Sequence, residues 1–324
     1  MRDKKVNTCE KKLSIIIPHY NSPKLLERML ESIPNHEEIE VIIVDDRSDS
    51  EVIEYKECKK RFSGRNIYFF DNDLPGKGAG TCRNIGTTKA VGKWLLFADA
   101  DDCFVDDFCD KLAPFLNSGA DIVYFVPTSI ELDTNKEALR HIETKELVNN
   151  YLHKSNKKNE LYLRYRFVQP WSKLIKRQLV LDHGLAFEEI VVGNDCMFSM
   201  KAAFCAKEIA ASSEVIYCIT RRDGSLTTLI SYEIFKVRLE VFIRRYLFLK
   251  EHLSKQEFKL LNLHGRGYVW RAILMRYSLI EIFEVYRTLR KNKVHLLNKE
   301  LFNIYLSAKR FFHSVKKIKR DKYW

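Results

Sequence analysis

Glycine and proline are scarce in this chain of 324 residues, which contains 12 glycines and 7 prolines. No short unit recurs and no segment is low in complexity, so we expect neither a repeat architecture nor a long disordered linker. No apolar run approaches the roughly 18 residues that suggest a membrane-spanning helix. The first residues are charged and lead straight into a short apolar segment, which does not predict a signal peptide.

The eight cysteines include no C-x-x-C pair and are scattered along the chain. Structural zinc sites and disulfide frameworks both need cysteines at short, regular spacings, so neither is expected. The pattern is typical of a protein of the reducing cytoplasm.

The excess of positive charge lies entirely in the last third of the chain. Residues 232–324 hold 22 Lys and Arg against 8 Asp and Glu, a net charge of +14, whereas the remainder carries −2. A basic region on a near-neutral body indicates an anionic partner, such as lipid headgroups, a phosphorylated acceptor or nucleic acid. A solvated, lysine-rich helical surface is the alternative.

Short apolar runs alternate with amphipathic stretches over the first 130 residues. The alternation predicts an α/β fold, with a mainly parallel sheet and helices on both of its faces. The expected strands are residues 13–17, 39–44, 66–70, 93–98 and 121–126. Residues 131–231 are less regular, and residues 232–324 have the apolar spacing of helices.

Carboxylates follow the expected strands. Asp45 and Asp46 come after the second strand, and Asp99-Ala100-Asp101-Asp102 comes after the fourth. Ligands bind beyond the carboxyl ends of parallel strands, and oxygen ligands of this kind suit Mg²⁺ or Mn²⁺. We therefore expect a metal site at this edge. Isolated acids of this type also cap helices, which is the alternative for Asp102.

The segment Gly76-Lys77-Gly78-Ala79-Gly80 fits neither of two phosphate-binding motifs. A dinucleotide fingerprint should follow the first strand, and a P-loop needs Ser or Thr directly after its lysine. The segment leads to Arg83 at the start of a helix, where it is suited to a phosphate or a base edge. Pairing of Arg83 with a structural carboxylate is the alternative.

Several ordered motifs together resemble those of the family 2 glycosyltransferases, which have the GT-A fold and act in bacterial polysaccharide and capsule synthesis. The resemblance covers roughly residues 13–228. The matching segments are residues 15–21, 44–48, 78–86, 99–102, 171–177, 194–195 and 222–227.

The sequence pattern and the resemblance together divide the chain into three parts. Residues 1–130 would form the half that binds the nucleotide sugar, and residues 131–231 the acceptor-binding half of the same GT-A domain. Residues 232–324 would form a basic helical C-terminal region.

The resemblance also implies direct displacement with inversion at the anomeric carbon. Asp195 is the expected base that deprotonates the acceptor hydroxyl. Asn194 stands where the family has a glutamate, which puts the role of that glutamate in question. Trp171 and Lys173 are expected on the acceptor side together with Asn194, although a core position is the alternative for Trp171.

The donor would be a nucleotide diphosphate sugar, with a uridine nucleotide expected, bound with Mn²⁺ or Mg²⁺. Tyr20 would stack near the base, Asp45 or Asp46 would bind base or ribose, and Asp99 and Asp101 would hold the metal. The expected donor-side residues are Pro18, Tyr20, Asn21, Asp45, Asp46, Arg83, Asp99, Ala100 and Asp101.

The expected reaction is hexosyl or N-acetylhexosaminyl transfer to a saccharide or to an acceptor carried on a lipid diphosphate. Residues 309–324 have the pattern of a basic amphipathic helix, which predicts binding to the inner face of the cell membrane. Packing on the body or between copies of the chain is the alternative. A nucleotidyltransferase and a nucleic-acid-binding protein are the rival functions, and no nucleic acid is expected as a partner.

Overall fold

The computed structural model describes residues 10–49, 53–221 and 231–296. Contacts divide the chain into two compact units. Of the described residues, the first unit comprises 10–49, 53–190 and 194–221, and the second comprises 191–193 and 231–296.

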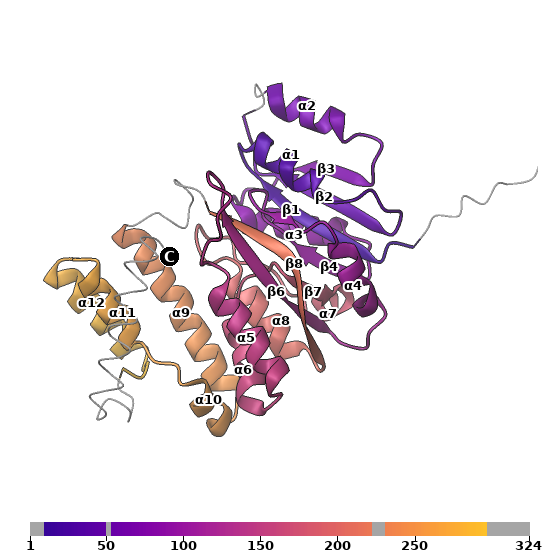
Figure 1. Ribbon diagram of the computed structural model, residues 1–324. Coiled ribbons are helices and arrows are strands. Elements are labelled where there is room, and N and C mark those ends of the chain that lie inside the picture. Colours follow the sequence, from indigo (N-terminus) through magenta and orange to yellow (C-terminus); the bar gives the residue numbers. More distant parts are fainter. Residues whose placement is uncertain (1–9, 50–52, 222–230, 297–324) are drawn as a thin grey trace, which may run out of the picture. The chain divides into compact units, whose positions relative to one another are not determined.

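The described residues of the first unit form an eight-stranded sheet in the order β3-β2-β1-β4-β7-β6-β8-β5 (Figure 1). The neighbours within β3-β2-β1-β4 run parallel, as does the β6-β8 pair, whereas β7 is antiparallel to both of its neighbours and β5 to β8. The strands are β1 Leu13–His19, β2 Ile39–Asp45, β3 Ile67–Asp71, β4 Trp94–Phe97, β5 Cys103–Phe104, β6 Ile122–Glu131, β7 Lys173–Lys176 and β8 Ile209–Arg221.

Helices join and cover these strands, in the α/β arrangement predicted from the sequence. For example, α3 packs on β1 and β2, and α5 packs on β6 and β8. The helices of this unit are α1 Pro23–Glu31, α2 Ile53–Arg61, α3 Ala79–Lys89, α4 Phe108–Leu116, α5 Ile142–His153, α6 Lys157–Arg166, α7 Arg177–Asp182 and α8 Cys196–Cys205.

Strands β1, β2 and β4 are buried along almost their whole length, which explains their continuous apolar sequences. Their parallel register brings His19 opposite Asp45, and Asp45 opposite Asp71. The residues at and just beyond these strand ends therefore meet at one edge of the sheet. Helix α1 begins with Pro23, which favours the first turn, and buries Leu26 and Met29.

The second unit contains α9 Tyr232–His252, α10 Lys255–Leu261, α11 Arg266–Leu274 and α12 Leu279–Lys291. Its core is apolar and includes Phe235, Tyr246 and Leu289, each at most 2% exposed. The helical character predicted after residue 232 is therefore confirmed over the part described. The predicted amphipathic segment 309–324 lies outside the described residues. No described helix is long and apolar enough to cross a membrane.

Candidate active site

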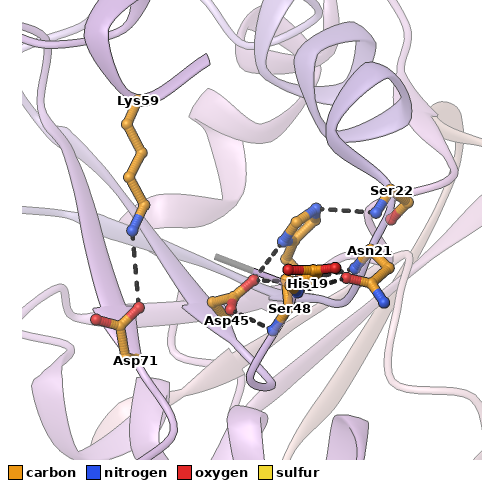
Figure 2. A network of polar contacts seen from close by, with 8 residues as sticks. His19, Asn21, Ser22, Asp45, Ser48, Lys59 and Asp71 are labelled. Carbon is orange, nitrogen blue, oxygen red and sulfur yellow. Dashed lines mark hydrogen bonds and ion pairs between the residues drawn. The ribbon is translucent and has the colours of Figure 1, made fainter. Parts of the chain in front are cut away.

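Asp45, at the end of β2, is the centre of a polar network (Figure 2). His19 Nδ1 lies 2.6 Å from Asp45 Oδ1, and the backbone and hydroxyl of Ser48 donate to the same carboxylate at 2.8 and 2.6 Å. The backbone N–H of Ser22 donates to His19 Nε2 at 3.3 Å, which leaves the ring proton on Nδ1, facing Asp45. Burial acts to raise the pKa of Asp45, but the hydrogen bonds from His19 and Ser48 outweigh it and lower that pKa.

The network fixes the loop that follows β1. Asn21 has a positive φ of 43°, and its backbone N–H donates to the Ser48 hydroxyl at 2.8 Å. Its side-chain oxygen accepts a hydrogen bond from the Asp49 backbone. Asp45 itself is 4% exposed, so its carboxylate braces this loop. Sequence reasoning placed Asp45 at this edge but assigned no such role to His19.

Asp46 organises the loop between β3 and α3. Its carboxylate accepts hydrogen bonds from the Asn72 side chain and from the Gly78 backbone, each at 2.7 Å. Arg47, at a φ of 62°, donates to the carbonyls of Asn72, Leu74 and Gly76. Asp46 and Arg47 therefore hold the glycine-containing segment against the end of β2.

Three acids after β4 lie close together. One carboxylate oxygen of each of Asp99, Asp101 and Asp102 lies within 4.8 Å of the others. Asp99 and Asp101 are partly exposed, whereas Asp102 is 3% exposed. Hard carboxylate oxygens at this separation suit a divalent cation, which offsets their mutual repulsion. The residues present therefore fit a Mg²⁺ or Mn²⁺ site.

Residues of strand β8 form hydrogen bonds to this cluster. The Tyr217 hydroxyl donates to Asp102 at 2.7 Å and accepts from the Asp99 backbone at 2.9 Å, and the Thr220 backbone donates to Asp102 at 2.7 Å. Burial, and then the charges of Asp101 and Asp99, raise the pKa of Asp102. Helix α4 takes its N-cap from Asp107, so Asp102 belongs to the cluster and does not cap that helix.

Helix α1 also reaches the cluster. Arg28 Nη2 donates to the Asp101 carbonyl at 2.5 Å and to the Thr220 hydroxyl at 3.2 Å. Sequence reasoning missed Arg28, Tyr217 and Thr220. Only the fold joins them to the Asp-x-Asp segment, because their own local sequences give no sign of a site.

Arg83 bridges the acidic cluster and the segment that contains Asp195. Its two terminal nitrogens donate to Asp99 Oδ1 at 2.5 Å and to Asn194 Oδ1 at 2.9 Å. The guanidinium carbon lies 5.4 Å from the centre of the Phe187 ring, and the residue is 5% exposed. Arg83 therefore does pair with a carboxylate, as the alternative in the sequence analysis foresaw, but that carboxylate is Asp99 of the acidic cluster.

Asp195 occupies the N-cap position of α8 and is partly buried. Burial raises the pKa of its carboxyl group, and the nearby Arg83 charge opposes that rise. A carboxylate with a raised pKa is a better proton acceptor at neutral pH than an ordinary aspartate. The adjacent Asn194 carbonyl accepts from the Glu188 backbone at 3.1 Å, which fixes this segment.

Two of the residues expected on the acceptor side, Trp171 and Lys173, are buried. Trp171 is 8% exposed and stacks on Tyr217, with the ring centres 5.8 Å apart. Lys173 is 2% exposed, and its ammonium donates to the Phe167 carbonyl at 2.5 Å. Burial lowers the pKa of Lys173 to about 7, although the Asp195 charge acts to raise it. A direct role of either residue toward an acceptor stays a prediction.

The remaining donor-side residues line the same edge. Tyr20 is 60% exposed directly after β1, and Pro18 is partly exposed within that strand. Ala100 is 7% exposed, between the two acids of the Asp-x-Asp segment. An open aromatic side chain at a strand end can stack on a planar base.

Comparison with known proteins gives the chain a family. Residues 14–184 match the model of Glycosyl transferase family 2. A putative glycosyltransferase, EpsH of Bacillus subtilis, is 24% identical over 261 residues, which cover 76% of this chain and 72% of EpsH. The poly(ribitol-phosphate) beta-N-acetylglucosaminyltransferase TarS of Staphylococcus aureus is 26% identical over 229 residues, which cover 66% of this chain but only 36% of TarS.

Solved structures share the fold. The crystal structure of S. aureus TarS in complex with UDP-GlcNAc has a TM-score of 0.65 and 23% identity, covering 87% of this chain and 80% of that one. The mannosyltransferase PcManGT from Pyrobaculum calidifontis, in complex with GDP-Man and Mn²⁺, has a TM-score of 0.56 and 14% identity, covering 94% and 81%. The fold is therefore GT-A, with helices added at the C-terminal side, and the chain belongs to family 2 of the glycosyltransferases.

Proposed function

We propose that the enzyme transfers a hexosyl or N-acetylhexosaminyl group from a nucleotide diphosphate sugar, with inversion, to a saccharide or a lipid-linked saccharide in cell-surface polysaccharide synthesis. The observation that carries this proposal is the bridge made by Arg83. One buried guanidinium contacts both Asp99 of the acidic cluster and Asn194, the neighbour of Asp195. The donor-side acids and the expected base therefore flank a common site.

Asp195 would accept the proton of the acceptor hydroxyl. The freed oxygen attacks the anomeric carbon as the bond between sugar and diphosphate breaks, so one displacement inverts that carbon. The raised pKa of Asp195 favours this proton transfer, and the nearby Arg83 charge limits that rise.

Asp99 and Asp101 would hold the Mn²⁺ or Mg²⁺ ion, with Asp102 behind them. When bound, a divalent cation neutralises charge that develops on a diphosphate leaving group. Tyr217 and Arg28 keep the acids and their backbone in place. The Mn²⁺ named with PcManGT and the UDP-GlcNAc named with TarS support a divalent ion and a nucleotide sugar as ligands.

Tyr20, with Pro18 and Asn21, would form the base-binding wall of the donor site. The hydrogen bonds of Asp45 and Asp46 to neighbouring loops favour a supporting role for both acids in the free enzyme. A uridine nucleotide is the donor that the family resemblance and the UDP-GlcNAc of TarS favour.

We place the reaction in the cytoplasm, at the inner face of the cell membrane, with the basic residues 309–324 contributing to membrane attachment. The helices of the C-terminal region would offer a contact between copies of the chain. The partly basic C-terminal unit is the one observation that favours nucleic-acid binding instead, and nucleotidyl transfer is the remaining rival.

A panel of nucleotide sugars, assayed for release of nucleotide diphosphate with Mn²⁺ and with EDTA, tests this function. We expect release from a uridine diphosphate sugar with Mn²⁺ and its loss with EDTA. Release of pyrophosphate from a nucleoside triphosphate and a sugar phosphate would support the nucleotidyltransferase reading. Retention of single-stranded DNA at physiological salt, without any sugar transfer, would support nucleic-acid binding.

A further inference from the structure

Helix α12 of the C-terminal unit presents large apolar side chains to solvent. Leu279, Ile280 and Phe283 are 85%, 81% and 63% exposed, and Tyr286 is 43% exposed. These four residues recur at helical spacing on the side of α12 away from its buried residues Val285 and Leu289. A contiguous patch of exposed apolar side chains on a folded helix is typical of a surface that binds a protein or a membrane.

The same exposed side becomes basic toward the end of the helix. Arg287, Arg290 and Lys291 are all exposed and follow the apolar residues along the outward face. The acids of α12 are engaged within the unit: Glu281 closes a capping box with Ser278, and Glu284 accepts a hydrogen bond from the Tyr232 hydroxyl at 2.9 Å. The outward face is therefore apolar in its first turns and cationic in its last.

We propose that this face of α12, defined by Leu279, Ile280, Phe283 and Tyr286 with Arg287, Arg290 and Lys291, binds the surface of an anionic lipid bilayer. The apolar side chains would enter the region below the headgroups, and the arginines and lysine would contact lipid phosphates. Helices with this distribution lie in the membrane interface, where each basic residue adds attraction to anionic lipids.

The charge of this face helps to distinguish a lipid surface from three other candidate partners: the terminal segment of the chain, a second copy of the chain and nucleic acid. Residues 297–324 contain 8 Lys and Arg against 2 Asp and Glu, a net charge of the same sign as that of the basic end of α12. A second copy of the same face would likewise meet a surface of its own sign. Nucleic acid would satisfy the basic residues but would leave Leu279 and Ile280 uncovered. An anionic lipid surface satisfies both halves of the face.

The test is flotation of the full-length protein with liposomes, read without any donor sugar, so that its result is separate from that of the transfer assay. The wild type should float with vesicles containing phosphatidylglycerol and far less with pure phosphatidylcholine. The variant that combines Leu279→Ser, Ile280→Ser and Phe283→Ser should bind about tenfold more weakly or worse.

A matched control removes three exposed apolar side chains of the first unit, by Val91→Ser, Leu152→Ser and Leu181→Ser, and should float like the wild type. Thermal melts of both variants should overlay that of the wild type, since all six side chains are exposed. A second comparison, Lys316→Gln with Lys317→Gln and Lys319→Gln, measures the contribution of the terminal segment separately.

The proposal is overturned if the α12 variant floats with anionic vesicles as the wild type does. It is also overturned if the wild type is a dimer that the α12 variant converts to a monomer while vesicle binding is unchanged, because the face would then join two copies. Equal losses in the α12 variant and in the control would show general surface hydrophobicity and would overturn it too.

Discussion

Arg83 and Asp99 form an ion pair, with 2.5 Å between the guanidinium nitrogen and the carboxylate oxygen. The arginine comes from α3 and the aspartate from the end of β4, and the second fork of the guanidinium reaches Asn194. A planar, two-pronged donor is suited to holding two such partners at once. The acidic cluster and the segment of Asp195 thus share one rigid connection.

Replacing Arg83 with lysine keeps the charge but removes the fork, so one of the two contacts must be lost. We expect turnover to fall by about 10- to 100-fold, in line with the loss of a preorganised charged contact in an active site. The rate of nucleotide diphosphate release measures it. The control is Arg61→Lys, because Arg61 pairs with Glu27 and Glu31 on the surface. Wild-type turnover in the Arg83 variant would show that the bridge has no part in catalysis.

Tyr217→Phe removes the hydroxyl that joins the Asp99 backbone to the Asp102 carboxylate. The buried Asp102 carboxylate and the partly buried Asp99 backbone N–H then lose a partner, so we expect the free energy of unfolding to fall by about 1–3 kcal/mol. We also expect a higher Mn²⁺ concentration for half-maximal turnover. Urea unfolding and a Mn²⁺ titration measure the two effects. The exposed Tyr68 provides the control, Tyr68→Phe, which should change neither quantity.

The raised pKa of Asp195 sets a pH dependence. As the proposed base, Asp195 would work only when deprotonated, so turnover should rise with pH through its pKa, which lies above the ordinary value of 3.8. We expect this rise with pH in the turnover number measured at saturating Mn²⁺ and donor. Burial that raises a carboxyl pKa also opposes folding once the group ionises, so Asp195→Asn should be more stable than the wild type above that pH. A turnover number that falls with rising pH over this range would contradict the role of Asp195 as base.

Gly80, at the start of α3, allows close packing against the segment before Asn194. A Cβ atom at position 80 would lie 2.3 Å from the Glu188 carbonyl oxygen. Gly80→Ala should therefore destabilise the fold by about 1–3 kcal/mol, as overpacking does. Gly267→Ala in α11 is the control: nothing lies within 4 Å of its added Cβ, so helix propensity should leave that variant at least as stable as the wild type. Identical melting temperatures for the two variants would refute this packing argument.

The sequence alone was sufficient to predict the buried strands of the first 130 residues, because each of them is a short, largely apolar run. It also located the acids that follow β2 and β4, since parallel strands place their carboxyl ends together. Tyr217 and Arg28 could not be found this way. Strand β8 joins the sheet beside β6 and β5, and no local pattern indicates that its tyrosine lies beneath the Asp-x-Asp segment.

The antiparallel strand β7 also escaped prediction, and with it the depth of Lys173. A lysine in a short segment reads as a surface residue, because lysine is rarely buried. Here the strand runs between β4 and β6 in the middle of the sheet, so its first three residues are buried. The basic composition of residues 232–324 was recognised from the sequence, but only the structure showed that apolar residues of α12 face outward.

Donor affinity and turnover, measured together in Asp101→Ala and Asp195→Asn, test the central claim that the acidic cluster binds the donor and Asp195 is the base. In the presence of Mn²⁺, Asp101→Ala should lose turnover and bind the nucleotide sugar more weakly. Asp195→Asn should bind it like the wild type while turnover falls by about 10²- to 10⁴-fold, the usual contribution of a positioned base. An equal loss of donor affinity in both variants would contradict this division of roles.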